Sequence, residues 1–286
     1  MTPALSVEDI AARLEAHLRS LVGPRDPYLG KAKHQLAQQY IKEEMGKWGT
    51  PFAQSFCSQG QEYCNWQLKI EGKRPQLEPF LVGAHYDTVP GSPGADDNTS
   101  GLAVLLWLAE RLSQTQPRRS VHFVAFDLEE YGLLGSTACA TAWKEQGRSL
   151  YLMLSLEMLG YFSNERRSQQ YPLPALSRIY PNTGNFIALI GNAATIPKMM
   201  RLKRQLKTAD APCQWLPVVD SGKALPATRR SDHAPFWDRG YPALLVTDTA
   251  DLRNPHYHQL SDRIETLNIE MMAKIARGLM AYLLEA

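Results

Sequence analysis

The sequence contains no uninterrupted run of about eighteen apolar residues, the length that a helix needs to cross a bilayer. Its start, MTPALSVEDIAARLEAHL, also lacks the basic residues and apolar stretch of a secretory signal. We therefore expect a soluble protein without a membrane partner, cytoplasmic as the sequence stands and periplasmic or secreted if its start was processed.

An excess of charge of one sign is missing as well. The 31 basic and 29 acidic residues leave a formal net charge of +2, which is too small to indicate a nucleic-acid surface. One basic cluster, KMMRLKRQLK at 198–207, has the spacing of a solvated helix face, and no recognition motif accompanies it. We expect no nucleic-acid partner.

Cysteine is scarce, and the 4 cysteines do not have the spacing of a zinc finger. Cys57 and Cys64 could face each other across a hairpin loop and form a disulfide in an oxidising compartment. Two free thiols are the simpler interpretation.

The 286 residues are compatible with a single domain over 1–286. Ser6 and Asp9 predict a helix start, and a second helix is expected to stop at Gly49. The runs PFAQSF and CNWQLKI then predict an antiparallel hairpin at a sheet edge. Residues 1–75 thus form N-terminal helices plus an edge hairpin.

From residue 79 onward, short apolar strands alternate with helices. The strands are PFLVGAHYD, VHFVAFD, LYLMLSLE and YPALLVTD, and the helices are expected at 100–114, 131–144, 195–208 and 268–284. Strands that are apolar on both faces predict an α/β fold: a mostly parallel, mixed central sheet flanked by helices on both faces. The polar segment 161–185 is expected to be an excursion near the site.

Side chains that can bind a metal stand at the carboxyl end of each of these strands. In an open α/β sheet the ligand crevice lies at this edge, so such residues converge there. They are His85 and Asp87, then Asp127 with Glu129 and Glu130, then Glu157, and last His256 and His258, with Asp97 in the loop PGADDNTSG.

Imidazole and carboxylate donors on one rim suit zinc. Glu157 supports this interpretation, because a charged residue inside an apolar strand needs a partner or a cation. A carboxylate in a tight loop can bridge two ions, and Asp97 is placed to do so, whereas Asp96 is expected to brace the loop. The plainer alternatives are packed histidines and, for Glu129 and Glu130, the acidic first turn of a helix.

With these residues in place, the chain resembles the bi-zinc aminopeptidase family, the co-catalytic zinc exopeptidases whose clan includes glutamate carboxypeptidase and the glutaminyl cyclases. The similarity extends from about residue 79 to the C-terminus, and its order of motifs makes it specific. They are GAHYDT, PGADDNTSG, FDLEEYGLLGS, SLEMLGY, SDHAPFWDRGYPAL and YHQLSDRIETL.

The resemblance implies a zinc-exopeptidase three-layer sandwich that holds two zinc ions. His85 and Glu157 would bind one ion, Glu130 and His258 the other, and Asp97 would bridge them. The resemblance also makes Glu129 the general base and Asp87 the carboxylate that orients His85, and it brings Asp232 and His233 toward the site. Where the family usually has Asp, this chain has Glu157. The ion held by His85 and Glu157 is therefore expected to bind differently from its counterpart in the family.

The function implied is that of a metal-dependent exopeptidase, an aminopeptidase that hydrolyses N-terminal peptide bonds of a peptide or amide substrate. Three alternatives remain open: a glutaminyl cyclase with one zinc ion, a carboxypeptidase, and an inactive binding homologue. A carboxypeptidase would need a cation for the substrate carboxylate, and the candidates are Arg229, Arg230 and Arg239. An apolar specificity pocket is expected from Tyr161, Phe162 and Trp237. The sequence leaves the oligomeric state open.

Overall fold

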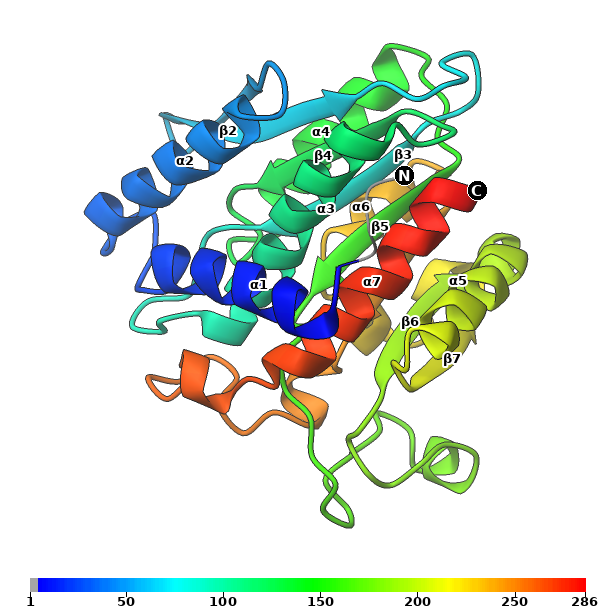
Figure 1. The fold of residues 1–286 in the computed structure, drawn as a ribbon. Coiled ribbons are helices and arrows are strands. Elements are labelled where there is room, and N and C mark those ends of the chain that lie inside the picture. Colours follow the sequence, from blue (N-terminus) through cyan, green and yellow to red (C-terminus); the bar gives the residue numbers. More distant parts are fainter. Residues whose placement is uncertain (1–4) are drawn as a thin grey trace.

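An eight-stranded mixed sheet forms the centre of the computed structural model, which describes residues 5–286 (Figure 1). The N-terminal stretch MTPALSVEDIAARLEAHL, in which no secretory signal was found, begins with residues 1–4, and these lie outside the described part. The strands are β1 (Phe52–Ser58), β2 (Gln61–Ile70), β3 (Phe80–His85), β4 (Val121–Phe126), β5 (Leu152–Glu157), β6 (Ile187–Asn192), β7 (Cys213–Val218) and β8 (Ala243–Thr247).

Four central strands are parallel neighbours in the order β4-β3-β5-β8. The edges are mixed: β2 runs antiparallel to β4, and β6 runs antiparallel to β8 and parallel to β7. This confirms the predicted α/β class with a mostly parallel, mixed sheet. All four central strands end at the same edge, which is where the candidate site lies.

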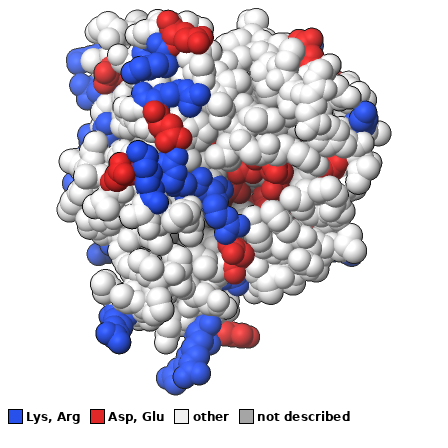
Figure 2. Space-filling view, turned by 180° about the vertical axis from the view of Figure 1, so that it is seen from behind, with Lys and Arg blue, Asp and Glu red and all other residues white. Residues whose placement is uncertain are grey.

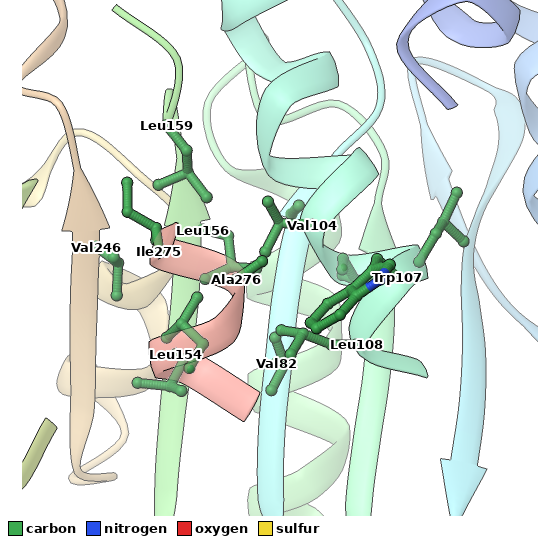
Figure 3. Packing of buried hydrophobic residues seen from close by; sticks show 14 of the residues in the cluster. Val82, Val104, Trp107, Leu108, Leu154, Leu156, Leu159, Val246, Ile275 and Ala276 are labelled. Carbon is green, nitrogen blue, oxygen red and sulfur yellow. The ribbon is translucent and has the colours of Figure 1, made fainter. Parts of the chain in front are cut away.

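Helices cover both faces of the sheet. One face carries α1 (Val7–Leu21), α2 (Lys31–Gly46), α3 (Gly101–Thr115), α5 (Ile196–Thr208) and α7 (Ile269–Glu285), and the other carries α4 (Leu134–Glu145) and α6 (His233–Asp238). In Figure 3, side chains of α3 and α7 such as Trp107 and Ile275 lie against Val82, Leu154 and Val246 of the strands. No helix within residues 5–286 is long and apolar enough to cross a membrane.

The predicted N-terminal elements are present. Ser6 caps α1 by accepting from the Asp9 backbone amide at 3.1 Å, and the Asp9 side chain accepts in return. The hairpin of β1 and β2 lies at one edge of the sheet. Its register pairs Cys57 with Glu62 and Cys64 with Ser55, so the two cysteines do not face each other, and both are free thiols.

Two strands, one helix start and one helix end differ from the sequence prediction, the last because α2 ends at Gly46 rather than at Gly49. Strands β6 and β7 were not predicted, since β6 ends in a Gly-Asn pair and β7 contains Pro217, which lacks an N–H and suits the sheet edge that β7 occupies. Helix α4 begins at Leu134 rather than at 131, because Gly132 and Leu133 have positive φ angles of 103° and 61°. Glu129 and Glu130 therefore lie in a loop and not in the first turn of a helix.

A buried histidine in β4 makes stability depend on pH. His122 is 5% exposed, and burial, reinforced by the cations of Arg148 and Lys69, lowers its pKa to about 3. Its unfolded pKa is near 6.5, so the unfolded chain takes up a proton first, and stability is lost as pH falls below about 6.5. We expect the contribution of His122 to the free energy of unfolding to fall by up to about 1.4 kcal/mol for each pH unit below about 6.5.

The variant His122→Phe keeps an aromatic ring beside Trp143, whose ring centroid lies 5.0 Å away. Urea denaturation of wild type and variant at pH 8, 6, 5 and 4 measures the effect. The stability of the variant relative to wild type should rise as pH falls. If the free energies of unfolding of the two proteins change in parallel with pH, His122 does not contribute to the pH dependence of stability.

Candidate metal centre

The polar residues predicted at the strand ends occupy one edge of the sheet. His85 ends β3 and Glu157 ends β5, while Glu129 and Glu130 follow β4. Asp97 lies in the turn Ala95–Ser100 before α3, and His258 lies in the loop after β8. The turn packs beneath the cluster, which is why all six side chains of Ala95–Ser100 are buried.

Asp97 lies between the two histidines. Its Oδ1 is 3.2 Å from Nε2 of His85, and its Oδ2 is 3.1 Å from Nε2 of His258. The His258 Nε2 is also 3.2 Å from Oε2 of Glu130, and the His85 Nε2 is 3.4 Å from Oε1 of Glu157. One carboxylate thus faces two sets of ligand atoms.

The potential ligands form two compact groups. His85, Glu129 and Glu157 offer donor atoms within 4.8 Å of one another, and Asp97, Glu130 and His258 do the same. Glu129 is the more distant member of the first group, because its Oε2 is 4.0 Å from the His85 Nε2. Asp97 and Glu157 are both nearer to this nitrogen, so Glu129 stands beside the group rather than at its centre.

Asp87 holds three parts of the site in place. Its Oδ1 and Oδ2 accept from the backbone amides of Glu129 and Glu130, each at 3.1 Å. Nδ1 of His85 lies 3.2 Å from the backbone carbonyl of Asp87 and 3.4 Å from its Oδ1. Asp87 therefore fixes the loop that carries the two glutamates through its carboxylate, and it orients the imidazole mainly through its backbone carbonyl.

The paired aspartates of PGADDNTSG have different environments. Asp96 turns away from the cluster and accepts from the Gly160 amide at 2.9 Å and from Nδ2 of Asn254 at 2.7 Å. Asp262 accepts from the backbone amides of both Asp96 and Asp97, at 2.8 and 3.1 Å. Asp96 thus braces the loop, as predicted, and Asp97 faces the site.

The longer side chain of Glu157 still reaches the cluster. Its Oε2 accepts from Oγ of Ser231 at 2.8 Å, which leaves Oε1 directed at His85. Ser231 was not predicted as a site residue, although it lies next to Asp232 in the SDHAPF motif. A serine in a loop gives no sequence signal of such a contact.

Two strand-end residues do not belong to the cluster. Asp127 is 2.8 Å from Nε2 of His34 and accepts from the Tyr86 hydroxyl, so α2 and the residue that follows β3 satisfy it inside the protein. His256 contacts the Ser261 hydroxyl at 2.9 Å in an exposed position. The prediction that these two residues converge with the others is therefore wrong.

Asp232 and His233 lie behind the site and are fully buried. Within residues 5–286 neither carboxylate oxygen of Asp232 has a hydrogen-bond partner, and burial raises its pKa to about 7. His233 faces away, with Nε2 2.8 Å from the Thr228 carbonyl. Asp232 thus approaches the acidic cluster and His233 does not.

The electrostatics of the cluster show an excess of negative charge. Burial raises the pKa of Glu130 to about 7, and it raises the pKa of Glu129 and Glu157 as well. Although burial opposes it, contact with Asp97 and Glu130 raises the pKa of His258 to about 10. Although burial opposes it, contact with His258 and His85 lowers the pKa of Asp97, so the cluster favours protons on its glutamates and imidazoles and an ionised Asp97 between the two histidines.

The residues fit a divalent cation. Among the described residues, the buried Oε1 of Glu130 and Nε2 of His258 make no hydrogen bond, although the His258 nitrogen lies 3.1 to 3.2 Å from two carboxylate oxygens. Histidine nitrogens and carboxylate oxygens are zinc ligands. A cation placed among them would satisfy these atoms and offset the excess of negative charge.

A pocket of about 360 Å³ opens beside the cluster, and Glu129, Glu130 and Glu157 form one end of it. The predicted excursion overhangs it through Gln169, Tyr171, Pro172, Leu176 and Tyr180. The space-filling view shows a hollow on this face in which acidic side chains gather, with basic side chains beside it (Figure 2).

The lining residues correct two predictions. Tyr161, Phe162 and Trp237 do not line this pocket, and the Trp237 indole donates to the Ala243 carbonyl in the core instead. Aromatic lining comes from Tyr171, Tyr180, Phe186, Trp215 and Tyr257. Of the three arginines considered for carboxylate binding, Arg230 lines the pocket, whereas Arg229 pairs with Asp238 and Arg239 bonds Thr141. Arg230 itself contacts Asp251 at 2.9 Å and Tyr257 at 3.0 Å.

The chain is similar to known protein sequences. Residues 65–283 match Peptidase family M28. The uncharacterized protein YfbL of Escherichia coli is 37% identical over 216 residues, which are 71% of this chain and 66% of that protein. Leucine aminopeptidase 1 of Arthroderma gypseum is 28% identical over 233 residues, 76% of this chain and 56% of that protein. The chain therefore covers less than two thirds of the length of these curated relatives.

Solved structures share the fold. The LapA aminopeptidase of Legionella pneumophila matches 97% of this chain and 72% of its own, with a TM-score of 0.73 and 19% identity. A glutaminyl cyclase of Bacteroides thetaiotaomicron bound to N-acetylhistamine matches 99% of both chains, with a TM-score of 0.71 and 14% identity. A Zn-dependent exopeptidase of Parabacteroides distasonis matches 100% of both chains, with a TM-score of 0.70 and 16% identity.

Proposed function

Since the chain belongs to Peptidase family M28, we propose that it is a zinc-dependent aminopeptidase that removes N-terminal residues from peptides. The family match also confirms the resemblance to the bi-zinc exopeptidases. The observation that carries the proposal is the position of Asp97, whose two oxygens face the Nε2 atoms of His85 and His258 at 3.2 and 3.1 Å.

In this proposal the site holds two zinc ions. His85 and Glu157 would hold one ion, Glu130 and His258 would hold the other, and Asp97 would be shared between them. When bound, zinc supplies Lewis-acid chemistry: it withdraws electron density from a carbonyl oxygen and makes water more acidic. Asp87 and Ser231 keep the ligands oriented through the contacts described above.

Glu129 acts as the general base. It lies beside the ligand groups, and its backbone is fixed by Asp87, so one carboxylate can face a water molecule while Glu130 faces the ions. Glu129 accepts the proton of the attacking water and returns it to the nitrogen of the leaving amine. Burial and the charges of Glu157 and Glu130 raise its pKa, and bound cations would oppose that rise.

The surroundings of the cluster favour a substrate with a free α-amino group. Glu129, Glu130 and Glu157 form the end of the pocket next to the cluster, and carboxylate oxygens that the ions leave free can accept hydrogen bonds from an ammonium group. The remainder of the pocket is largely apolar, which suits an uncharged side chain of the first residue. Arg230 is already paired with Asp251, so a terminal carboxylate would have to compete for it.

Product analysis tests the proposal against its alternatives. We expect the zinc-supplied protein to release the first residue of short peptides, to act equally on C-terminally amidated peptides, and to fail on N-acetylated ones. Mass spectrometry of the products separates the outcomes. Loss of ammonia from an N-terminal glutamine would indicate a cyclase, release of the last residue would indicate a carboxypeptidase, and no turnover of any substrate would indicate an inactive homologue.

A further inference from the structure

The floor of the pocket is the face of three neighbouring strands. In the register of the sheet, Glu157 pairs with Thr247, Thr247 with Ala188, and Ala188 with Gln214. One lateral row therefore runs from the candidate metal centre across β8 and β6 to β7. With neighbouring strands about 4.8 Å apart, Gln214 lies about 14 Å from Glu157 along this row.

The side chains of this row face the pocket. Successive residues of a strand point to opposite faces, and Leu189 and Val246, which alternate with the row, belong to the core on the opposite face. Ala188, Gln214 and Thr247 line the pocket, as do Ile190, Leu216 and Leu245 of the next row on the same face. The small side chain of Ala188 leaves the path to Gln214 open.

Most polar side chains of the pocket are already engaged within the protein. Gln169 accepts from Arg253 at 2.7 and 2.9 Å and donates to the Thr249 hydroxyl at 3.0 Å. The hydroxyls of Tyr171 and Tyr180 donate to the carbonyls of Pro181 and Trp215.

Gln214 differs from these residues. Within residues 5–286 its side-chain amide takes part in no hydrogen bond, and its backbone carbonyl accepts from Cys213 Sγ at 3.4 Å. An amide that lines a largely apolar pocket without a protein partner is available to a ligand.

We infer that the pocket selects peptides whose first residue is tyrosine, and that the Gln214 amide recognises the phenol hydroxyl. This inference rests on the proposed aminopeptidase function. With the α-amino group at the carboxylates, a leucine side chain would end over Thr247 and Ala188, whereas the para position of a phenyl ring lies farther along the row toward β7. The aromatic rings of Phe186 and Tyr180 beside this path suit an aromatic side chain.

A charged group at the end of the substrate's first side chain is disfavoured in the part of the pocket near Gln214. Arg230 and Asp251 neutralise each other, and the neighbouring floor residues Ile190, Leu216 and Leu245 are apolar. Burying a lysine or glutamate tip there would cost desolvation without a counter-charge. A neutral hydroxyl needs one hydrogen bond, which the amide of Gln214 can donate or accept.

The test compares tyrosine amide with phenylalanine amide, which differ by the hydroxyl. For wild type we expect kcat/KM to favour tyrosine amide about 3- to 10-fold, and L-tyrosine to bind more tightly than L-phenylalanine by a similar factor in calorimetry. Gln214→Leu should bring both ratios to about 1 while turnover of alanine amide stays unchanged. Gln146→Leu, an exposed position after α4, is the matched control.

A second variant tests whether the substrate side chain lies over the pocket floor at Ala188, rather than whether its hydroxyl contacts Gln214. Ala188→Leu should lower kcat/KM for both aromatic amides about tenfold or more relative to alanine amide, because the added side chain occupies the floor. The inference, but not the proposed function, would be overturned if wild type handled tyrosine and phenylalanine amides equally well. It would also be overturned if the tyrosine-to-phenylalanine ratios were unchanged in Gln214→Leu. Absence of turnover on all three amides would instead overturn the proposed function, and the amino-acid binding ratios would still decide the role of Gln214.

Discussion

Replacing Glu129 with Gln should lower kcat about 10²- to 10⁴-fold, which is the range that general acid–base catalysis contributes. Glutamine has nearly the same shape, but it cannot accept the proton of the attacking water. The Glu129 backbone amide would still donate to Asp87, so the loop should stay in place. Turnover of an aminoacyl amide and zinc content, measured on the same preparation, check this expectation.

Zinc content separates the two roles that the geometry allows for Glu129. As a general base, the residue can be replaced without loss of metal, whereas a third ligand beside His85 and Glu157 cannot. Glu145→Gln at the exposed end of α4 serves as the control. Full activity in Glu129→Gln would show that another group takes the proton, and loss of zinc would reassign Glu129 as a ligand.

Replacing Arg25 with Met should lower the free energy of unfolding by about 3 to 5 kcal/mol. Arg25 is fully buried, and its guanidinium donates to five backbone carbonyls, those of Leu21, Gly23, Tyr86, Pro93 and Gly94, at 2.8 to 3.1 Å. Burial lowers its pKa to about 10, and the nearby carboxylates of Asp262 and Asp87 oppose that fall. Without the guanidinium, these carbonyls lose their donors and the acidic cluster loses a cation.

Urea denaturation measures this loss. Arg19→Met on α1 is the matched control, because its side chain is 69% exposed and its ion pair with Glu15 should contribute less than about 1 kcal/mol. Arg25→Lys should fall between wild type and Arg25→Met, since it keeps the charge but has fewer donors. A loss below about 1 kcal/mol in Arg25→Met would mean that water or a shifted backbone satisfies the carbonyls.

Much of the site could be predicted from the sequence because its geometry follows from sheet topology. Parallel strands end at a common edge, so His85 and Glu157 could be placed together from the apolar runs that precede them. The loop PGADDNTSG could be read in the same way, because Asp97 stands between a strand and the helix that packs back on it. These inferences need the order of the elements and not their detailed packing.

The rest depends on contacts that leave no local pattern. Asp127 is excluded from the cluster by His34 of α2, which is 93 residues away in sequence. Part of the pocket lining comes from β6 and β7, and these two strands were not predicted. Arg25 looks like any exposed arginine in the sequence, since its acceptors are backbone carbonyls contributed by three separate segments.

Zinc titration of the metal-free protein by calorimetry tests most directly whether Asp97 joins two ions. We expect two zinc ions per wild-type chain, and weakened binding of both in Asp97→Ala but not in the exposed-site control Asp210→Ala. One ion per wild-type chain, or two ions that bind Asp97→Ala as tightly as wild type, would contradict the account.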